Sequence, residues 1–233
     1  WGMARKKYSC DFETTTDVND CRVWAYGYME IGNKQNYKIG NSIDDFMELV
    51  RVCQGDLYFH NLKFDGSFIV NWLLKNGYRH DDSGQPYTFT TIISDMGQWY
   101  MIDVCYGYKG KKTPRKIHTR IYDSLKKLPF KVSQIAKGFD LPIRKGEIDY
   151  HKPRPIGYEP TEDEKAYIKN DIEIIADALQ TQFDQGQDRM TNGSDSLYGF
   201  KASISKQMFD YMYPVFSLEL DANIRLAYRG GFT

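Results

Sequence analysis

The hydrophobic period changes repeatedly along the first 77 residues, and this constrains the fold more than any other feature. Residues 6–13, 21–31 and 35–40 alternate as strands do and fit an antiparallel meander. Residues 42–55 instead repeat apolar side chains at helical spacing after Ser42, an expected N-cap, and end at Gly55. A buried strand at 56–60 and a helix over 65–77 follow. This order predicts a mixed α/β sheet flanked by helices.

The rest of the chain continues the mixed pattern. Strands are expected at 88–93, 97–106 and 115–123, with a basic, turn-rich tip between the last two. Thr161 and Glu164 form a capping-box pattern that begins a long amphipathic helix ending near Gly186. A looser segment, 191–199, and another helix near 200–213 complete the prediction.

Composition narrows the class of protein. The chain has 233 residues, 41% of them hydrophobic, enough for a substantial core. Its net charge of zero gives no global indication of nucleic acid, although a locally basic groove stays open. The four cysteines form no C-x-x-C pair, which favours free thiols in a reducing cell interior over a zinc site. No apolar run predicts a membrane span or a signal peptide.

Two acids lie one residue apart near the end of the first strand. Because side chains alternate across a strand, Asp11 and Glu13 share one face, opposite Cys10 and Phe12. These acids either line a solvated strand edge or hold a positive group. Taken alone, the solvated edge is the simpler interpretation.

Two further acids stand in helical contexts. Asp65 lies at the expected start of the 65–77 helix, where an N-cap function would explain it. Asp171 follows Tyr167 by four residues, so the two share a helix face, near the boundary of the core. A carboxylate in such a position is costly unless it is paired or binds a metal.

Together the four acids predict a narrower chemistry. Asp11, Glu13, Asp65 and Asp171 come from three separate elements and can converge on hard cations such as Mg²⁺, which prefers oxygen ligands. Two such ions about 4 Å apart would promote in-line attack of water on a phosphodiester. Tyr167 could orient that water, although a phenol with a pKa near 10 is a poor base unaided.

The segments "DFET", "HNLKFD" and "YIKND", in this order, resemble the three exonuclease motifs of family B DNA polymerases, in the tyrosine variant of the DEDD superfamily. "CRVWAYGYM", "MGQWYMID", "YDSLKKLPF", "KGEIDYH" and "DRMTNGSDSL" extend the resemblance to protein-primed phage polymerases of the phi29 type, over nearly the whole chain. The resemblance implies an RNase H-like sheet. The "KTP" at 112–114 stands out from that resemblance as a short insertion.

The resemblance also implies a function for individual residues. Asp11, Glu13, Asp65 and Asp171 would bind two divalent ions, Mg²⁺ or Mn²⁺, and Tyr167 would hold the attacking water. The 3′ end of the DNA would be gripped by Thr14, Asn61 and Phe64. Single-stranded DNA would be supported by Tyr58, His60, Phe68, Ser124 and Leu125. The residues that assist at the scissile phosphate would be Lys145 and Tyr150.

Simpler interpretations stay open for several of these residues. Phe68 fits the core as well as a stacking surface, and a histidine after a strand, such as His60, is often only hydrogen-bonded. Lys145 lies in a loop, where most lysines are solvated, and the basic tip of 109–116 fits a solvated hairpin as well as a phosphate contact. Phe64 has the stronger case, because aromatic stacking suits sequence-independent binding of single strands.

We therefore expect a 3′–5′ exonuclease domain at 1–190 and, at 191–233, a linker towards a polymerase domain that this chain is expected to lack. The expected reaction is metal-dependent removal of 3′ nucleotides from single-stranded DNA in the cytoplasm of an infected bacterium. Primer-template DNA and the priming terminal protein would be partners of the parent polymerase. One alternative is a catalytically weak module that binds DNA or terminal protein; another is a tail at 191–233 that drives self-association.

Overall fold

The computed structural model describes residues 5–140 and 148–227. The chain divides into two compact units, Trp1–Met190 and Thr191–Thr233, which are described separately. No helix among the described residues is long and apolar enough to cross a membrane.

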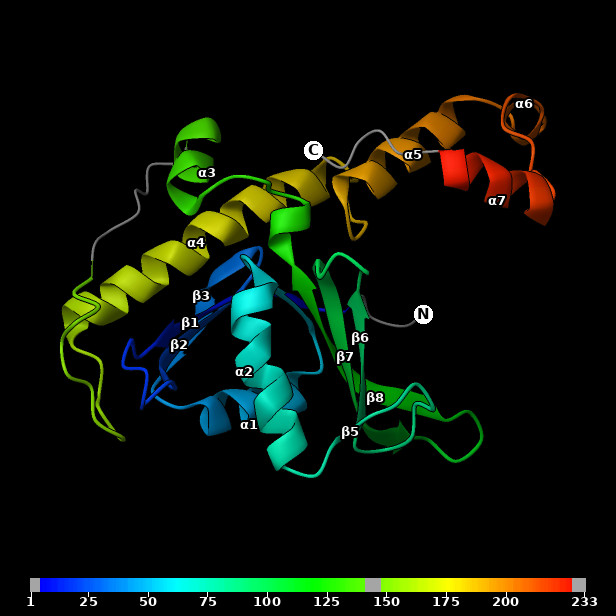
Figure 1. The fold of residues 1–233 in the computed structure, drawn as a ribbon. Helices are drawn as coiled ribbons and strands as arrows, with labels where there is room; N and C mark the ends of the chain where they lie inside the picture. Colours follow the sequence, from blue (N-terminus) through cyan, green and yellow to red (C-terminus); the bar gives the residue numbers. More distant parts are fainter. Residues whose placement is uncertain (1–4, 141–147, 228–233) are drawn as a thin grey trace. The chain divides into compact units, whose positions relative to one another are not determined.

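Within the described residues, the first unit contains an eight-stranded mixed sheet in the order β3-β2-β1-β4-β8-β7-β6-β5 (Figure 1). Its strands are β1 (Lys7–Thr14), β2 (Val23–Glu30), β3 (Asn33–Gly40), β4 (Asp56–Phe59), β5 (Arg79–His80), β6 (Thr88–Ile93), β7 (Trp99–Lys109) and β8 (Arg115–Asp123). β4 runs parallel to both β1 and β8, and β5 runs parallel to β6, whereas the other neighbours are antiparallel. The predicted α/β sheet flanked by helices is confirmed.

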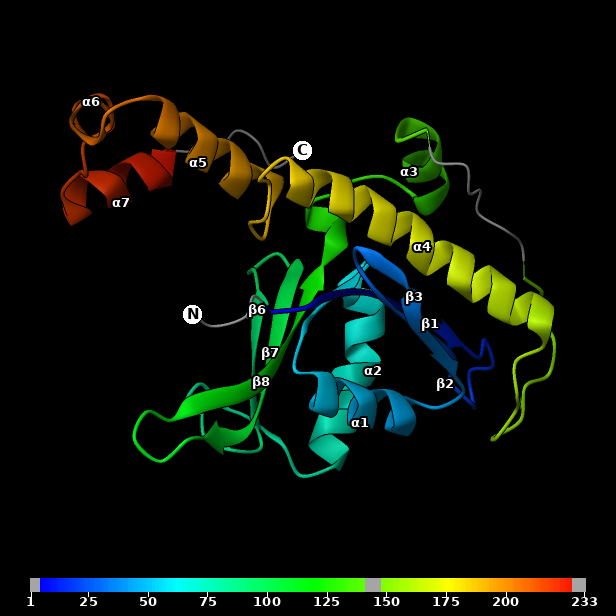
Figure 2. The same cartoon turned by 180° about the vertical axis from the view of Figure 1, so that it is seen from behind.

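Helices cover the two faces of the sheet differently. On one face, α1 (Ile43–Cys53) and α2 (Leu62–Lys75) pack on the apolar side of β1, where Phe12 meets Phe46 edge-on at 4.8 Å between ring centroids. On the other face lie α3 (Val132–Gly138) and the long α4 (Glu162–Asp184), which bury Tyr58 and Met29 (Figures 1 and 2). The face of β1 that carries Asp11 is therefore turned towards α4.

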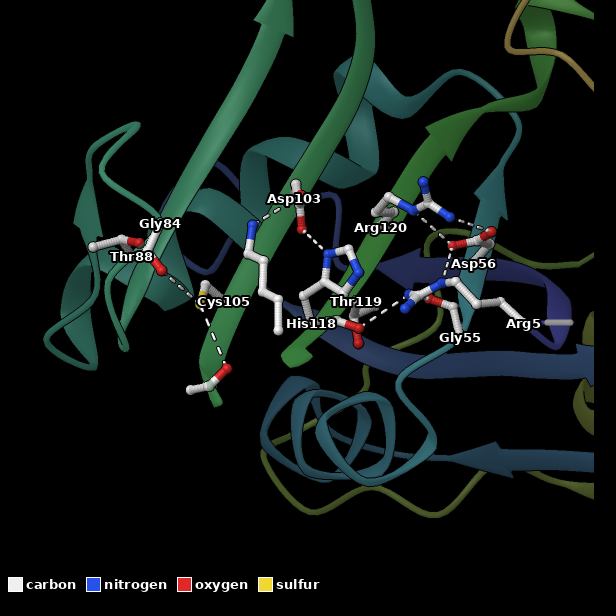
Figure 3. Close-up of polar contacts among 12 residues, drawn as sticks. Arg5, Gly55, Asp56, Gly84, Thr88, Asp103, Cys105, His118, Thr119 and Arg120 are labelled. Atoms are coloured by element: carbon white, nitrogen blue, oxygen red, sulfur yellow. Dashed lines mark hydrogen bonds and ion pairs between the residues drawn. The ribbon is translucent and has the colours of Figure 1, made fainter. Parts of the chain in front are cut away.

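Charged side chains on β4, β7 and β8 form ion pairs with one another and with Arg5 (Figure 3). Asp56 Oδ1 accepts from Arg5 Nε at 2.8 Å and from Arg120 Nε at 3.0 Å. On β7, Asp103 Oδ1 lies 2.8 Å from Nδ1 of His118 on β8. Asp56 lies at the start of β4, at the opposite end from the β4–α2 junction.

Local capping signals place two helices correctly. The Ser42 hydroxyl accepts from the Asp45 backbone N–H at 3.2 Å and begins α1. Thr161 and Glu164 form a reciprocal capping box at the start of α4, with hydrogen bonds of 2.9 and 3.3 Å. These signals succeed because both partners of each bond lie within three residues of one another.

The expected bounds of α2 were wrong, and so was the N-cap interpretation of Asp65. The helix begins at Leu62, after Asn61 in a left-handed conformation with φ of 77°, so Asp65 lies inside its first turn. The cap comes from another strand: Asp123 Oδ1 accepts from the backbone N–H of Asn61 at 3.0 Å and of Leu62 at 3.2 Å. No neighbouring residue signals this start, because the acceptor is about sixty residues away in the sequence.

The second unit is more helical than expected. Its described part contains α5 (Asn192–Ser203), α6 (Lys206–Met212) and α7 (Leu218–Ala227). The looser segment expected at 191–199 was wrong, and the helix expected near 200–213 is helical but divided between the end of α5 and α6. The Thr191 hydroxyl accepts from the Ser194 backbone N–H, which begins α5 earlier than expected. The Ser205 hydroxyl accepts from the Met208 backbone N–H, which begins α6 and divides the single helix expected near 200–213. Large apolar side chains of this unit are exposed, among them Val215 and Leu218.

Candidate active site

Four acids from three elements line a pocket of about 490 Å³ in the first unit. Asp11 and Glu13 come from β1, Asp65 from the first turn of α2, and Asp171 from α4. β1 contributes because it lies between β2 and β4 in the sheet, with α4 packed on the face that carries these acids. The sequence-predicted acids are therefore brought together around one space.

Three of the four carboxylate residues are almost fully buried. Glu13, Asp65 and Asp171 expose 6%, 3% and 4% of their surface, which excludes the solvated strand edge as the explanation of Glu13. Burial, and then the negative charges of Asp11 and Glu13, raise the pKa of Asp65 well above its ordinary value. Acids that disfavour one another's ionisation in this way gain from a nearby cation.

The donor chemistry of the pocket fits a divalent cation. Asp65 Oδ1 is buried and has no hydrogen-bond partner among the described residues. A buried carboxylate oxygen without a donor is costly, and carboxylate oxygens are the ligands that Mg²⁺ prefers. In the part of the chain that the structure describes, no group of three or more His, Cys, Asp or Glu side chains is gathered tightly enough to hold a metal as it stands.

Tyr167 stands beside these acids on α4. Its hydroxyl lies 3.0 Å from the hydroxyl of Tyr150, and both residues line the pocket. Burial, the hydrogen bond to Tyr150 and the charges of Asp171 and Glu13 all raise the pKa of Tyr167. Tyr167 therefore stays a neutral phenol, able to orient a water molecule but not to act as a base.

The start of α2 contributes the aromatic and amide side of the pocket. Asn61 and Phe64 line it, and Phe64 is 51% exposed, with its ring edge-on to Phe68 at 5.7 Å between centroids. His60 is held from both sides: Nε2 donates to the Phe130 carbonyl at 2.7 Å, and Nδ1 lies 3.1 Å from the Ser124 hydroxyl. An exposed ring beside an acidic pocket is available to stack on a base.

The family model "DNA polymerase type B, organellar and viral" matches residues 48–233. The chain belongs to this family. Curated type B relatives include the DNA polymerases of Bacillus phage M2, 66% identical over 99% of this chain, and of Streptococcus phage Cp-1, 28% identical over 92%. The chain spans about 40% of the length of the Bacillus phage M2 protein.

Solved type B polymerase structures agree with the fold. Phi29 DNA polymerase complexed with single-stranded DNA superposes with a TM-score of 0.93 at 64% identity, covering 99% of this chain and 40% of that one. Phi29 DNA polymerase complexed with primer-template DNA and incoming nucleotide substrates superposes with a TM-score of 0.92 and the same identity. The resemblance to phi29-type polymerases predicted from the sequence motifs is confirmed.

Several sequence-predicted residues lie outside the pocket. Tyr58 is buried beneath α4, stacked on Tyr122 at 5.3 Å between centroids. Ser124 is fully buried, its hydroxyl donating to the Phe59 carbonyl at 3.1 Å, and Leu125 follows it half-buried. Their part in DNA binding stays a prediction. Lys145 lies outside the described residues.

Sequence reasoning missed one residue that lines the pocket and one that supports it from outside. Thr16 lines the pocket, and its hydroxyl donates to the Tyr150 carbonyl at 3.2 Å, a contact across 134 residues that no local pattern announces. Asp123 lies inside "YDSLKKLPF" and holds the start of α2, whereas the sequence resemblance implies a function only for the two residues after it. Its signal was available: an acid at the end of a buried strand requires donors.

Proposed function

We propose that this chain is a 3′–5′ exonuclease that removes 3′-terminal nucleotides from single-stranded DNA. The observation that carries the proposal is the convergence of four carboxylates and a neutral tyrosine in one pocket. The first unit would be the exonuclease domain, and 191–233 would lead towards a polymerase domain. DNA at the 3′ end, and terminal protein in the parent polymerase, are the corresponding partners.

Asp11, Glu13, Asp65 and Asp171 would hold divalent ions, Mg²⁺ or Mn²⁺. When bound, these ions would supply Lewis-acid activation of water and neutralise charge at the scissile phosphate. The protein's own contribution is positioning: Tyr167 orients the water, and Thr14 and Asn61 grip the terminal nucleotide. The exposed Phe64 ring stacks on a base without reading its sequence.

The test uses single-stranded DNA labelled at its 3′ end, with Mg²⁺ or Mn²⁺. Wild type should release labelled mononucleotide, and the double variant Asp11→Ala, Glu13→Ala should not. The matched control, Asp82→Ala with Asp95→Ala, removes the same charge from exposed positions outside the pocket and should keep the wild-type rate. Equal release by wild type and the Asp11→Ala, Glu13→Ala variant would refute the proposal.

A second candidate function is a DNA-binding module that cleaves poorly. It is favoured by the similarity of the chain to phi29 DNA polymerase complexed with single-stranded DNA, of which the chain spans 40%. Binding of fluorescent single-stranded DNA in Ca²⁺, measured beside cleavage in Mg²⁺, separates the two. Tight binding without label release would favour the module.

A further inference from the structure

The segment 148–158 carries Tyr150 into the pocket, and it packs on the core through its two ends, Ile148 and Tyr158. Between Asp149 and Gly157 every residue is exposed except Arg154, which exposes 5% of its surface. The exposed middle of the segment depends for its position on the hydrogen bonds that hold it, which include the bond from the Thr16 hydroxyl to the Tyr150 carbonyl and those of the Arg154 side chain.

The Arg154 side chain connects this segment to α4 and to β2. Its Nε and Nη2 donate to Glu164 Oε1 at 3.2 and 2.9 Å, and its guanidinium carbon lies 4.0 Å from the centre of the Trp24 ring. The same guanidinium binds back to its own segment, donating to the carbonyls of Asp149 at 2.7 Å and Lys152 at 3.2 Å. Only a planar fork with several N–H donors can satisfy a carboxylate and two carbonyls at once.

The two carbonyls that Arg154 contacts lie on either side of Tyr150 in the sequence. The Asp149 carbonyl directly precedes Tyr150 in the chain, and Glu164 lies one helical turn before Tyr167 on α4. Arg154 thus ties the backbone next to one tyrosine to the helix turn next to the other. The two hydroxyls lie 3.0 Å apart.

We propose that Arg154 is a positioning residue that holds Tyr150 against Tyr167. It thereby fixes the position of the Tyr167 hydroxyl, which orients the attacking water. The catalytic part of this inference rests on the proposed exonuclease function. A buried ion pair is weak evidence of a stabilising purpose, since apolar residues often replace such pairs without loss. The two carbonyl contacts are what an apolar residue could not reproduce.

The kinetic test is a double-mutant cycle. Arg154→Met should lower kcat about tenfold, the equivalent of one hydrogen bond misplaced in the transition state, with little change in KM. In a Tyr150→Ala background the same change should cost less than about twofold, because the residue it positions is gone. Arg154→Lys keeps the charge but not the fork and should restore little of the loss.

Arg120→Met is the matched control. Arg120 donates through Nε and Nη2 to Asp56 at 3.0 Å each, and its guanidinium carbon lies 5.8 Å from the Tyr122 ring, so the lost contacts are of the same kind (Figure 3). This variant loses a carboxylate pair and a ring contact, as Arg154→Met does, but no bond to a backbone carbonyl, and it should keep the wild-type kcat. Arg154→Met leaves Glu164 without the guanidinium. The double variant Arg154→Met, Glu164→Gln is therefore measured as well, and it should show the same loss of kcat as Arg154→Met alone.

A second readout needs no activity. With ring-labelled tyrosine, NMR should detect a cross-ring NOE between Tyr150 and Tyr167 in the wild-type protein and in Arg120→Met, but not in Arg154→Met. If wild type does not cleave DNA, the proposed function fails while this measurement still decides the positioning. Retention of the NOE in Arg154→Met, or an undiminished Arg154→Met effect in the Tyr150→Ala background, would overturn the inference.

Discussion

Removal of the Asp123 carboxylate should destabilise the start of α2 more than the loss of an ordinary helix cap. A single oxygen, Oδ1, accepts from three backbone N–H groups: Asn61 at 3.0 Å, Leu62 at 3.2 Å and Leu125 at 3.0 Å. Asp123 exposes only 3% of its surface, so the three donors converge on a buried charge. The substitution Asp123→Ala leaves all three without their acceptor.

The size of the effect follows from where each donor lies. The Leu62 N–H lies in a fully buried bond and would lose its partner without access to water, at about 1–3 kcal/mol. The donors of Asn61 and Leu125 are part-buried and can turn to water, at about 0.5–1.5 kcal/mol each. We therefore expect Asp123→Ala to lower the free energy of unfolding by about 3 kcal/mol, or the melting temperature by roughly 6–12 °C.

Urea unfolding followed by circular dichroism measures this difference. Asp123→Asn keeps a carbonyl oxygen as acceptor and loses the charge, so it should cost only about 1 kcal/mol. Ser42→Ala serves as the control, since it removes a cap with one hydrogen bond from α1 and should also cost about 1 kcal/mol. A loss in Asp123→Ala no larger than in Ser42→Ala would refute the reasoning that three donors depend on this oxygen.

Three further predictions concern Tyr167, Glu164 and Phe64. Tyr167→Phe should lower kcat about tenfold or more with an unchanged melting temperature, and the wild-type rate should show no loss from tyrosine ionisation near pH 9, because burial and the bond to Tyr150 raise the Tyr167 pKa. Burial alone would raise the pKa of Glu164, but bonds from the Thr161 backbone, the Tyr158 hydroxyl and a guanidinium lower it to about 2. Its folded-state pKa is thus below its ordinary 4.5, so up to about 3 kcal/mol of stability present above pH 4.5 should vanish as the pH falls towards 2, and urea unfolding of Glu164→Gln should lack that acid-dependent part. Phe64→Ala should weaken binding of single-stranded DNA about tenfold in fluorescence anisotropy without lowering the melting temperature, because its ring is 51% exposed.

The parts of the site that could be predicted are those set by backbone geometry. Asp11 and Glu13 share a face because strand side chains alternate, and Tyr167 and Asp171 share one because a helix repeats every 3.6 residues. Both relations hold wherever the element is packed, so sequence alone suffices. The four acids could then be assigned to one site before any contact between their elements was known, and all four line the same pocket.

The parts that could not be predicted lie where the backbone is irregular. Asn61 adopts a left-handed conformation, and its N–H donates to Asp123 at the end of β8, a strand that neighbours β4 in the sheet but lies far from it in the sequence. The same long-range bond moved the start of α2 three residues earlier than the local pattern indicated. Helical periodicity alone cannot find such a boundary, because the residue that sets it belongs to another element.

Asp123 and Arg154 share a property that sharpens this distinction. Each is a buried charge, 3% and 5% exposed, and each fixes a stretch of backbone that carries a pocket residue. Physical chemistry requires that a buried charge find partners, so an acid or a guanidinium in apolar surroundings announces that a long-range contact exists. It does not say which backbone groups receive that contact. For Arg154 the partners are the carbonyls of Asp149 and Lys152, and only the three-dimensional fold reveals the contact beside Tyr150 on which the proposed positioning of this tyrosine rests.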